Sequence, residues 1–403
     1  MRSNYKKLGQ YIQQVNIKNS DLKVTNLLGV SITKEFIPSI ANTVGTDMSK
    51  YKVVKKGQFT YGAITSRNGD KISIALLEED EAIVSTSYTV FEVIDKEKLL
   101  PEYLMMWFRR TEFDRYARYM SHGSTREAFG WDEMCDVELP VPSIEKQASI
   151  VKEYKTITER IKLNEQLNQK LEETAQAIYK EWFVDFEFPD ENGKPYKSSG
   201  GEMEYCDELG MEVPKGWKLV PYTNMIDLKG GGTPSTAIDK YWDGEIPFFT
   251  PKDVSKSIYS ISTEKNITQY GFENSSTKIY PVNTVFITAR GTVGAVAMAS
   301  KDMAMNQSCY AAIGKDINQY FVYYHTLRSL DILKKHANGG VFGALVTRDF
   351  EKNMILSPDS QIIYKFGQIS EKLFKHILIK QKENHKLHLL KHILLSKMAT
   401  IEG

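Results

Sequence analysis

The sequence predicts an α+β fold in which two mixed α/β globules follow one another, each ending in a long helix. An apolar repeat that occurs twice and strand-like alternation before each copy carry this prediction. Of the 403 residues, 41% are hydrophobic and 26% are charged, a composition that excludes disordered, collagen-like and single coiled-coil chains. The length accommodates two or three domains at about 150 residues per domain.

The first globule is expected over residues 1–145. Within it, residues 55–93 alternate between apolar and polar side chains around a tight Arg-Asn-Gly-Asp turn, which predicts antiparallel strands. The aromatic segment 99–120 predicts helix, and the glycine-bearing segment 121–130 predicts a loop. Together these elements make a mixed α/β globule.

A long helix is expected to follow, over residues 146–187. From residue 150 to residue 182, mostly apolar side chains recur at alternating steps of four and three residues, which is the period of a coiled-coil seam. At 1.5 Å per residue, about 34 residues of such a helix extend for about 50 Å.

The second half of the chain repeats this order. Residues 281–313 alternate as strands, residues 318–336 form an aromatic helical segment, and residues 337–348 form another glycine-bearing loop. We therefore expect a second globule over residues 188–357 and a second long helix over residues 358–403.

The two long helices are expected to pack on each other as an antiparallel coiled coil with pseudo-two-fold symmetry. Both seams become polar in the middle, for example at Asn164 and Asn384, and polar seam residues fix the register at a cost in stability. The alternative is that each helix packs on its own globule. The residues predicted to pair the helices or to dock a partner are Gln147, Ile150, Ile157, Ile161, Leu171, Ile178, Phe366, Leu373, Ile377, Leu387 and Leu394.

Several classes of enzyme are excluded by missing motifs. The sequence has no phosphate-binding GxxxxGK[ST] loop, no dinucleotide-binding GxGxxG after a strand, no HExxH and no GxSxG elbow. The NPPY-type loop of amino-methyltransferases and the PD-ExK carboxylate cluster of nucleases are also absent. We therefore expect no catalytic residue in this chain.

Cysteine and histidine positions predict no bound metal. The three cysteines are far apart in the sequence and form no CxxC pair. His388 and His392 are four residues apart on a predicted helix, a spacing that suits a metal ion. A solvated basic helix face is the favoured interpretation of these two residues.

Net charge and hydropathy restrict which nucleic-acid and membrane partners the chain can have. There are 52 Lys and Arg residues against 51 Asp and Glu residues, a net charge of +1, so a uniformly basic nucleic-acid binder is excluded. Only the last helix is basic, and a DNA-binding surface on the globules must be a local patch. No apolar run approaches the roughly 18 residues of a membrane span, and no signal peptide is recognised, so we expect a cytoplasmic protein without a membrane partner.

Six segments resemble the specificity subunits of type I restriction–modification systems. The Pro- and Gln-containing helix start, the aromatic end of the first long helix and the glycine-rich opening of the second globule are the main features that carry the resemblance. It extends over essentially the whole chain and is weakest over residues 1–50. The segments are 139–151, 173–189, 208–220, 231–254, 305–313 and 355–358.

The resemblance implies a non-catalytic subunit that binds double-stranded DNA through two target recognition domains, each reading one half of a split sequence. It also implies that two copies of a DNA adenine methyltransferase subunit dock on the paired helices, and that two restriction subunits can join. The chain itself would hold no cofactor, whereas its partners would use S-adenosylmethionine and ATP with Mg²⁺. The family's Gln is Gln147, but Ile363 stands at the matching position of the second copy, where a two-residue slip would supply Gln361.

In the second globule, candidate DNA-contacting residues lie in four glycine-bearing or polar segments. Glycines let backbone N–H groups approach a phosphate, Arg reads guanine, and Asn and Gln read adenine. Each segment has an ordinary alternative: a tight turn, a solvated cation or a buried polar network. The candidates are Gly231, Gly232, Thr233, Ser235, Lys252, Arg290, Gly291, Asn306, Gln307 and Ser308.

In the first globule, candidates are assigned from the shared rhythm of the two halves and from a donor-rich loop. The two globules need not read the same bases, so the two sets need not match residue by residue. The candidates are Tyr61, Arg67, Lys71, Ser85, Ser87, Tyr88, Ser124, Thr125 and Arg126.

Two similar globules on rigid helices suit a target with two separated features, and DNA half-sites recur about every 34–36 Å along one face. The alternative function is a non-catalytic scaffold whose two globules bind proteins or RNA. Salt-dependent binding to duplex DNA would distinguish the two functions.

Overall fold

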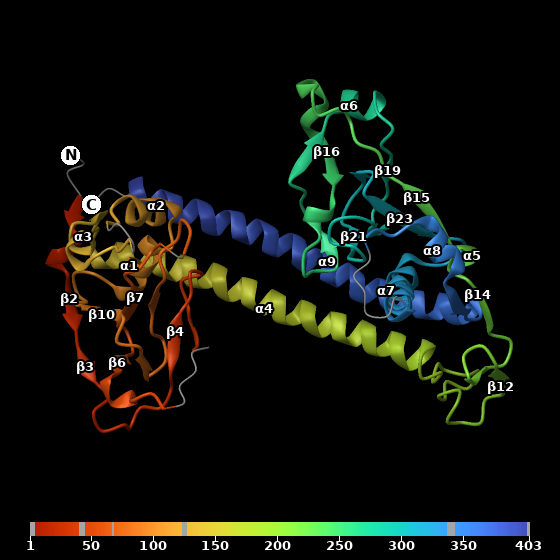
Figure 1. The fold of residues 1–403 in the computed structure, drawn as a ribbon, viewed down its shortest axis with the longest axis horizontal. Coiled ribbons are helices and arrows are strands. Elements are labelled where there is room, and N and C mark those ends of the chain that lie inside the picture. The colour runs from red at the N-terminus through yellow and green to blue at the C-terminus, as the bar shows by residue number, and fades with distance from the viewer. Residues whose placement is uncertain (1–4, 40–44, 67, 123–126, 337–342, 401–403) are drawn as a thin grey trace. The chain divides into compact units, whose positions relative to one another are not determined.

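The computed structural model describes residues 5–39, 45–66, 68–122, 127–336 and 343–400 (Figure 1). It divides the chain into two compact units: unit 1 is residues 1–160 with 387–403, and unit 2 is residues 161–386. Both divisions fall inside the long helices, which are α4 (Ile144–Phe183) and α9 (Ser360–Lys397). The domain boundaries expected above follow sequence order instead, and they stay a prediction.

The globule of unit 1 is built on antiparallel strands. A four-stranded sheet has the order β2-β10-β7-β8, a three-stranded sheet has the order β3-β6-β9, and β1 pairs with β11 and β4 with β5. The strands are β1 Tyr5–Lys7, β2 Ile12–Val15, β3 Ile17–Lys18, β4 Leu28–Val30, β5 Phe36–Pro38, β6 Lys52–Lys55, β7 Phe59–Gly62, β8 Ile74–Leu76, β9 Glu81–Val84, β10 Tyr88–Val93 and β11 Glu138–Pro140. The helices are α1 Pro101–Phe108, α2 Thr111–Tyr119 and α3 Trp131–Cys135.

Aromatic rings fill the core between the four-stranded sheet and α1 and α2. Phe59 of β7 stacks on Phe91 of β10 with ring centroids 4.8 Å apart. Phe108, the last residue of α1, lies 4.7 Å from the ring of Phe113 in α2. These stacked and tilted pairs stabilise the core beyond the area that they bury, and the strands and helices expected over 55–93 and 99–120 are confirmed.

The globule of unit 2 contains two larger sheets. A five-stranded sheet has the order β15-β23-β20-β21-β17 and a four-stranded sheet the order β18-β16-β22-β19; β17 is parallel to β21 and β16 to β22. The strands are β12 Met203–Cys206, β13 Met211–Pro214, β14 Lys218–Pro221, β15 Ile226–Gly230, β16 Trp242–Phe249, β17 Tyr259–Ser260, β18 Lys265–Ile267, β19 Ile279–Tyr280, β20 Val285–Thr288, β21 Val296–Ala299, β22 Met303–Met305, β23 Cys309–Gly314 and β24 Met354–Ser357. The helices are α5 Tyr222–Met225, α6 Gln269–Glu273, α7 Gln319–His336 and α8 Thr347–Lys352.

Within unit 2 the two long helices pack on each other antiparallel. The Nδ2 of Asn164 donates to the Oδ1 of Asn384 at 2.9 Å. Trp182, near the end of α4, lies 6.1 Å from Phe366, near the start of α9, between ring centroids. The predicted fold class is therefore confirmed. Asn164 and Asn384 are both buried, and their hydrogen bond satisfies polar groups that cannot bond to water.

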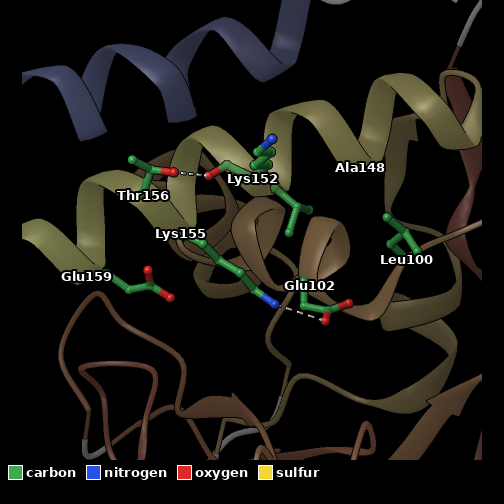
Figure 2. Close-up of a pocket in the computed structure, with 8 residues that line it drawn as sticks. Leu100, Glu102, Ala148, Lys152, Lys155, Thr156 and Glu159 are labelled. Carbon is green, nitrogen blue, oxygen red and sulfur yellow. Dashed lines mark hydrogen bonds and ion pairs between the residues drawn. The ribbon is translucent and has the colours of Figure 1, made fainter.

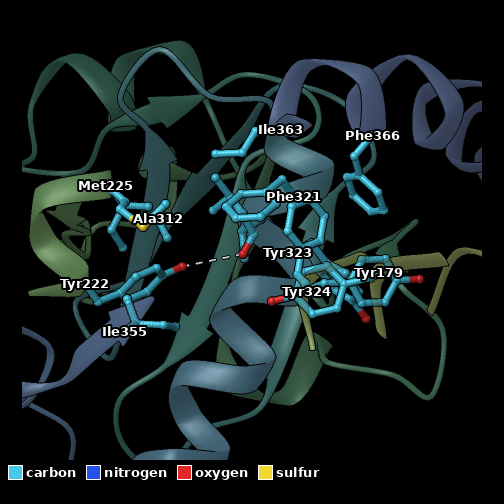
Figure 3. Packing of buried hydrophobic residues seen from close by; sticks show 14 of the residues in the cluster. Tyr179, Tyr222, Met225, Ala312, Phe321, Tyr323, Tyr324, Ile355, Ile363 and Phe366 are labelled. Atoms are coloured by element: carbon cyan, nitrogen blue, oxygen red, sulfur yellow. Dashed lines mark hydrogen bonds between the residues drawn. The ribbon is translucent and has the colours of Figure 1, made fainter. Parts of the chain in front are cut away.

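The long helices also belong to the cores of the globules. In unit 2, Phe183 of α4 lies 4.9 Å from Phe321 of α7 and 5.2 Å from Phe366 of α9 between ring centroids, in the aromatic cluster that Figure 3 shows. In unit 1, Ile150 of α4 and Leu395 of α9 belong to the core that contains the aromatic residues of α1. Each long helix thus contributes to both cores, which differs from the alternative of one helix on one globule.

The residues predicted to pair the helices or dock a partner all lie at covered positions. Gln147, Ile150, Ile161, Phe366 and Ile377 are buried. The remaining six residues, Ile157, Leu171, Ile178, Leu373, Leu387 and Leu394, are half-buried. Their burial agrees with the heptad pattern, and the docking of a partner on them stays a prediction.

Candidate nucleic-acid interface

Two glycines that follow β15 lie against the end of β22 and the loop after it. A Cβ atom at Gly231 would collide with the backbone carbonyl of Asn306, and a Cβ atom at Gly232 would collide with Ser276. The Gly232 N–H donates to the Met305 carbonyl at 3.0 Å. Because only glycine permits so close an approach of two backbone segments, these positions are required for the shape of the loops.

Polar side chains lie beside these glycines. The Thr233 hydroxyl donates to the side-chain oxygen of Gln307, and the Ser235 carbonyl accepts from the indole N–H of Trp242 at 3.1 Å. Gln307 and Ser235 are exposed. The segment after β15 and the loop at 306–308 therefore present hydroxyl and amide groups side by side.

The turn between β20 and β21 lies beside the same loop. The backbone N–H groups of Ala289 and Arg290 donate to the Ser308 carbonyl at 2.8 and 3.3 Å. Gly291 follows with φ of +79°, a left-handed conformation that favours glycine, and the Arg290 side chain is exposed. The Oδ1 of Asn306 accepts from the Ser308 N–H at 3.1 Å, so this amide takes part in a local polar turn.

The segment after β16 also lies beside the loop at 306–308. The Asn306 N–H donates to the carbonyl of Phe249, the last residue of β16, at 3.0 Å. Lys252 follows in a short helical turn, with 78% of its side chain exposed and its Nζ 3.6 Å from a carboxylate oxygen of Glu264. All the candidates of the second globule thus come from four segments that meet around the loop at 306–308.

One further cation approaches this cluster. A Cβ atom at Gly294 would lie 3.4 Å from the Cε of Lys334, which places this exposed α7 side chain beside the turn that carries Arg290. No sequence pattern identifies Lys334, because its position depends on the packing of α7 against β20 and β21.

In the first globule, Tyr61 is a core residue. Its side chain is 1% exposed, its ring centroid lies 6.0 Å from that of Phe91, and burial raises the pKa of its hydroxyl to about 12. An enclosed ring offers no surface to DNA, so we remove Tyr61 from the candidate contacts. The sequence pattern did not predict this burial. All three residues Phe59–Tyr61 of β7 are buried, so an alternation of apolar and polar side chains could not show which of them faces outward.

Ser85, Ser87 and Tyr88 form the turn that enters β10. The two serine Oγ atoms lie 3.2 Å apart, and Ser87 is exposed while Ser85 and Tyr88 are half-buried. The Tyr88 hydroxyl accepts from the Val30 N–H at 3.3 Å, so the β4–β5 hairpin lies beside this turn. The hairpin is a neighbour that the sequence pattern did not identify.

Arg67, Ser124, Thr125 and Arg126 lie outside the described residues, and Lys71 is exposed. The described residues that flank these two segments are hydrogen-bonded to each other. The Thr65 N–H donates to the Glu127 carbonyl at 2.9 Å, and the Thr65 hydroxyl donates to the Ser121 Oγ at 2.9 Å.

A buried ion pair holds the segment next to Lys71. The Lys34 Nζ donates to the Oδ1 of Asp114 at 2.5 Å and to the Ile72 carbonyl at 2.7 Å. The same Oδ1 accepts from the Ile72 N–H at 3.1 Å. Burial lowers the pKa of Lys34, although Asp114 opposes the shift. Together these bonds fasten the β4–β5 hairpin and the segment before β8 to α2.

Gln147 lies inside unit 1 rather than on its surface. Its Nε2 donates to the carbonyls of Lys98 and Pro142 at 2.8 and 2.9 Å, and its Oε1 accepts from the Leu100 N–H at 2.9 Å. The side chain is 0% exposed. In this structure Gln147 therefore fastens the start of α4 to the segment before α1.

A groove of about 390 Å³ lies between α1 and α4 in unit 1 (Figure 2). Its charged lining combines two acidic and two basic side chains, and the Nζ of Lys155 lies 3.3 Å from an oxygen of Glu102. Such a balanced lining does not attract a phosphate backbone, so we leave the groove out of the candidate DNA surface. It is lined by Leu100, Glu102, Ala148, Val151, Lys152, Lys155, Thr156 and Glu159.

Neither a metal site nor a membrane-spanning helix is found among the described residues. No group of three or more His, Cys, Asp or Glu side chains in that part of the chain has an arrangement that would hold a metal ion. None of the described helices is long and apolar enough to cross a membrane. His388 and His392 lie on the exposed side of α9.

Comparison with known proteins identifies relatives over most of the chain. Residues 8–173 and 214–389 match the family model for the type I restriction modification DNA specificity domain. The chain is 26% identical over 399 residues to the type I restriction enzyme HindI specificity subunit of Haemophilus influenzae, covering 86% of both chains. It is 26% identical over 322 residues to the MjaIX specificity subunit of Methanocaldococcus jannaschii, covering 78% of this chain and 72% of that one. Its fold is similar to the crystal structure of a type I restriction-modification S subunit from M. genitalium, with a TM-score of 0.65 and 12% identity over 99% of this chain and 96% of that chain.

Proposed function

The chain belongs to the family of type I restriction–modification specificity subunits, and we propose that it reads a DNA sequence in two separated parts, one with each globule. In this proposal it directs an adenine methyltransferase subunit, and a restriction subunit where one is present, to that sequence. The observation that carries the proposal is the meeting of four polar loop segments in unit 2. Family membership also favours this function over a scaffold that binds proteins or RNA.

The chemistry of the four segments fits duplex DNA. Arg290 stands on a turn with a glycine at the next position, and Arg is the side chain that most often reads guanine. The loop at 306–308 presents an exposed Gln307 amide, a group that pairs with adenine in the major groove. Lys252 and Lys334 add positive charge that would neutralise phosphates.

The charge balance predicts how tightly the chain binds by itself. With a net charge of +1, long-range attraction to the DNA backbone is small, and only the local patch contributes. We therefore expect the isolated chain to bind duplex DNA weakly, and the complex with its partner subunits to bind it tightly.

The partners supply the chemistry in this proposal. The chain has no catalytic step of its own, and two methyltransferase subunits would transfer methyl groups from S-adenosylmethionine. Two restriction subunits, where present, would use ATP and Mg²⁺ to translocate and cut DNA. Such a complex would act in the cytoplasm, where it meets unmodified DNA.

Mapping of methylated adenines in cells with and without the gene tests the proposal. The expected result is a bipartite sequence with an unspecified spacer that is methylated only when the gene is present. If the partner methyltransferase is expressed and the methylated positions do not change, the proposal is refuted.

A further inference from the structure

The edge strand of the five-stranded sheet is fastened to both long helices in unit 2. Among the described residues, β17 pairs with β21 on one side and with no strand on the other. N–H groups at an open sheet edge need other acceptors. The backbone of Ile258, next to β17, acts on the carboxyl of Glu172, in α4, and lowers its pKa. The Oε1 of Gln381, in α9, accepts from the Tyr259 N–H at 3.3 Å.

The two side chains also bond to each other. The Nε2 of Gln381 donates to the Oε1 of Glu172 at 3.4 Å, and Gln381 is 7% exposed. Glu172, Gln381 and the backbone N–H groups of Ile258 and Tyr259 thus form one polar cluster, which we call the helix–edge joint. Because Gln381 is buried and Glu172 is half-buried, loss of one side chain leaves the groups bonded to it without that partner.

The helix–edge joint lies a few residues along the chain from a candidate DNA contact. Lys252 belongs to the segment that leads into β17, and this segment is braced at Asp253. The Ser260 hydroxyl of β17 donates to the Asp253 carbonyl at 3.4 Å. The Asp253 carboxylate accepts from the backbone N–H groups of Thr250 and Glu264, each at 2.7 Å. Movement of β17 would therefore move Lys252.

We infer that Glu172 and Gln381 are positioning residues that hold β17, and through it the Lys252 segment, in the orientation in which the second globule reads its half of the DNA sequence. This inference rests on the proposed function for its DNA readout. Neither side chain needs to touch DNA, since both act through the backbone of Ile258 and Tyr259.

The protonation of Glu172 makes this role testable. Burial raises the pKa of Glu172 to about 7, and the hydrogen bond from Ile258 opposes the shift. The groups that face it are Tyr323 and Tyr324 of α7 and Gln381 of α9, with the Ile258 N–H, and none of these is a cation.

The sign of the pH effect follows from this shift. The pKa of Glu172 in the folded chain lies above its ordinary value of 4.5, so the folded state favours the protonated carboxyl. The stabilisation is complete below about pH 4.5 and is lost as the pH rises through about 7, because an ionised Glu172 must then stay in a poorly hydrated site. We expect the helix–edge joint to loosen between about pH 6 and pH 8.

Amide hydrogen exchange on the full chain tests the joint without DNA. In Glu172→Ala and Gln381→Ala, exchange over residues 251–260 is expected to accelerate about tenfold. Glu173→Ala is the matched control, since Glu173 is the next residue of α4 and its side chain is 51% exposed. Unchanged exchange over 251–260 in both joint variants would overturn the inference.

Binding by the complex with its methyltransferase tests the consequence for readout. The probes are duplexes that carry the mapped methylated sequence, or that sequence with one base pair replaced in either half. Glu172→Ala is expected to lower discrimination about tenfold in one half and to leave the other half unchanged. Equal changes in both halves would show a merely structural effect and would contradict the inference.

The pH dependence of Glu172→Gln tests whether ionisation of Glu172 loosens the helix–edge joint. Glu172→Gln keeps an oxygen acceptor and cannot ionise, so its discrimination should stay constant from about pH 6 to pH 8 while that of the wild type falls. Parallel profiles of the two proteins would count against a role for Glu172. If no bipartite sequence is methylated, the proposed function fails, and the exchange measurement still decides whether the joint holds β17.

Discussion

The two globules hold the starts of their long helices by different means. In unit 1 the buried Gln147 side chain reaches from α4 to the segment before α1. In unit 2 the matching residue, Ile363, is buried in the apolar core, and the Asn318 side chain donates to its carbonyl at 2.9 Å. Gln361, which a two-residue slip would supply, is exposed. The two halves of the chain therefore share the position at which the long helix begins, but they hold it with different residues.

The loops near the candidate DNA contacts differ in the same way. Unit 1 fastens its hairpin and loop with the buried Lys34–Asp114 ion pair. Unit 2 brings its segments together through Gly231 and Gly232, at positions where a side chain would collide with the neighbouring loop. One globule thus depends on a buried charge pair and the other on close backbone packing, and each should fail under a different substitution.

The largest effect is expected from Asp114→Ala in unit 1. It leaves the Lys34 ammonium buried without its partner, which costs about 3–5 kcal/mol of unfolding free energy. Denaturant unfolding of the full chain measures the loss. Glu78→Ala removes an exposed acid of unit 1, and should change the stability by less than about 0.5 kcal/mol. Equal stability of the two variants would show that the ion pair contributes nothing.

The next effect is expected from Gly231→Ala in unit 2. The added methyl group collides with the Asn306 carbonyl, and overpacking of this kind costs about 1–3 kcal/mol. Thermal unfolding and duplex binding by the complex are both measured, and both should weaken. Gly230→Ala is the control, because a Cβ atom there meets open space. If the two variants behave alike, the close approach of the loops is not required.

A smaller effect is expected from Gln147→Ala. The Leu100 N–H and two carbonyls lose their partner, at a cost of about 1–2 kcal/mol in unfolding free energy. Gln361→Ala, at an exposed position of the other long helix, should change the stability by less than about 0.5 kcal/mol. Denaturant midpoints of the two variants check this contrast, and a reversed order would mean that the second copy uses its Gln after all.

The smallest effect is expected from Lys252→Ala, which should leave the fold unchanged. If its ammonium binds a phosphate, the slope of log affinity against log salt falls by about one for duplex DNA bound by the complex. Titrations at several salt concentrations measure the slope. Lys194→Ala, an exposed lysine outside the four segments, should leave the slope as in the wild type. An unaltered slope in Lys252→Ala would remove that residue from the interface.

Much of the architecture was predictable because helical and strand periods are local properties of the chain. The heptad pattern located α4 and α9, and the buried Asn164–Asn384 pair agrees with the polar centre of both seams. The surface was harder to predict. Tyr61 lies in a strand segment that is buried along its length, so the period of two could not assign it to a face.

By itself, the sequence determined the duplication, the long helices, the strand segments and the four polar segments of the second globule. Only the tertiary structure decided that these segments meet around one loop, that Lys334 approaches them, and that Glu172 and Gln381 close the edge of β17. The physical reason is that these contacts join residues far apart along the chain. A pattern in the sequence records which face of an element is apolar, but the packing of whole elements decides which polar groups become neighbours.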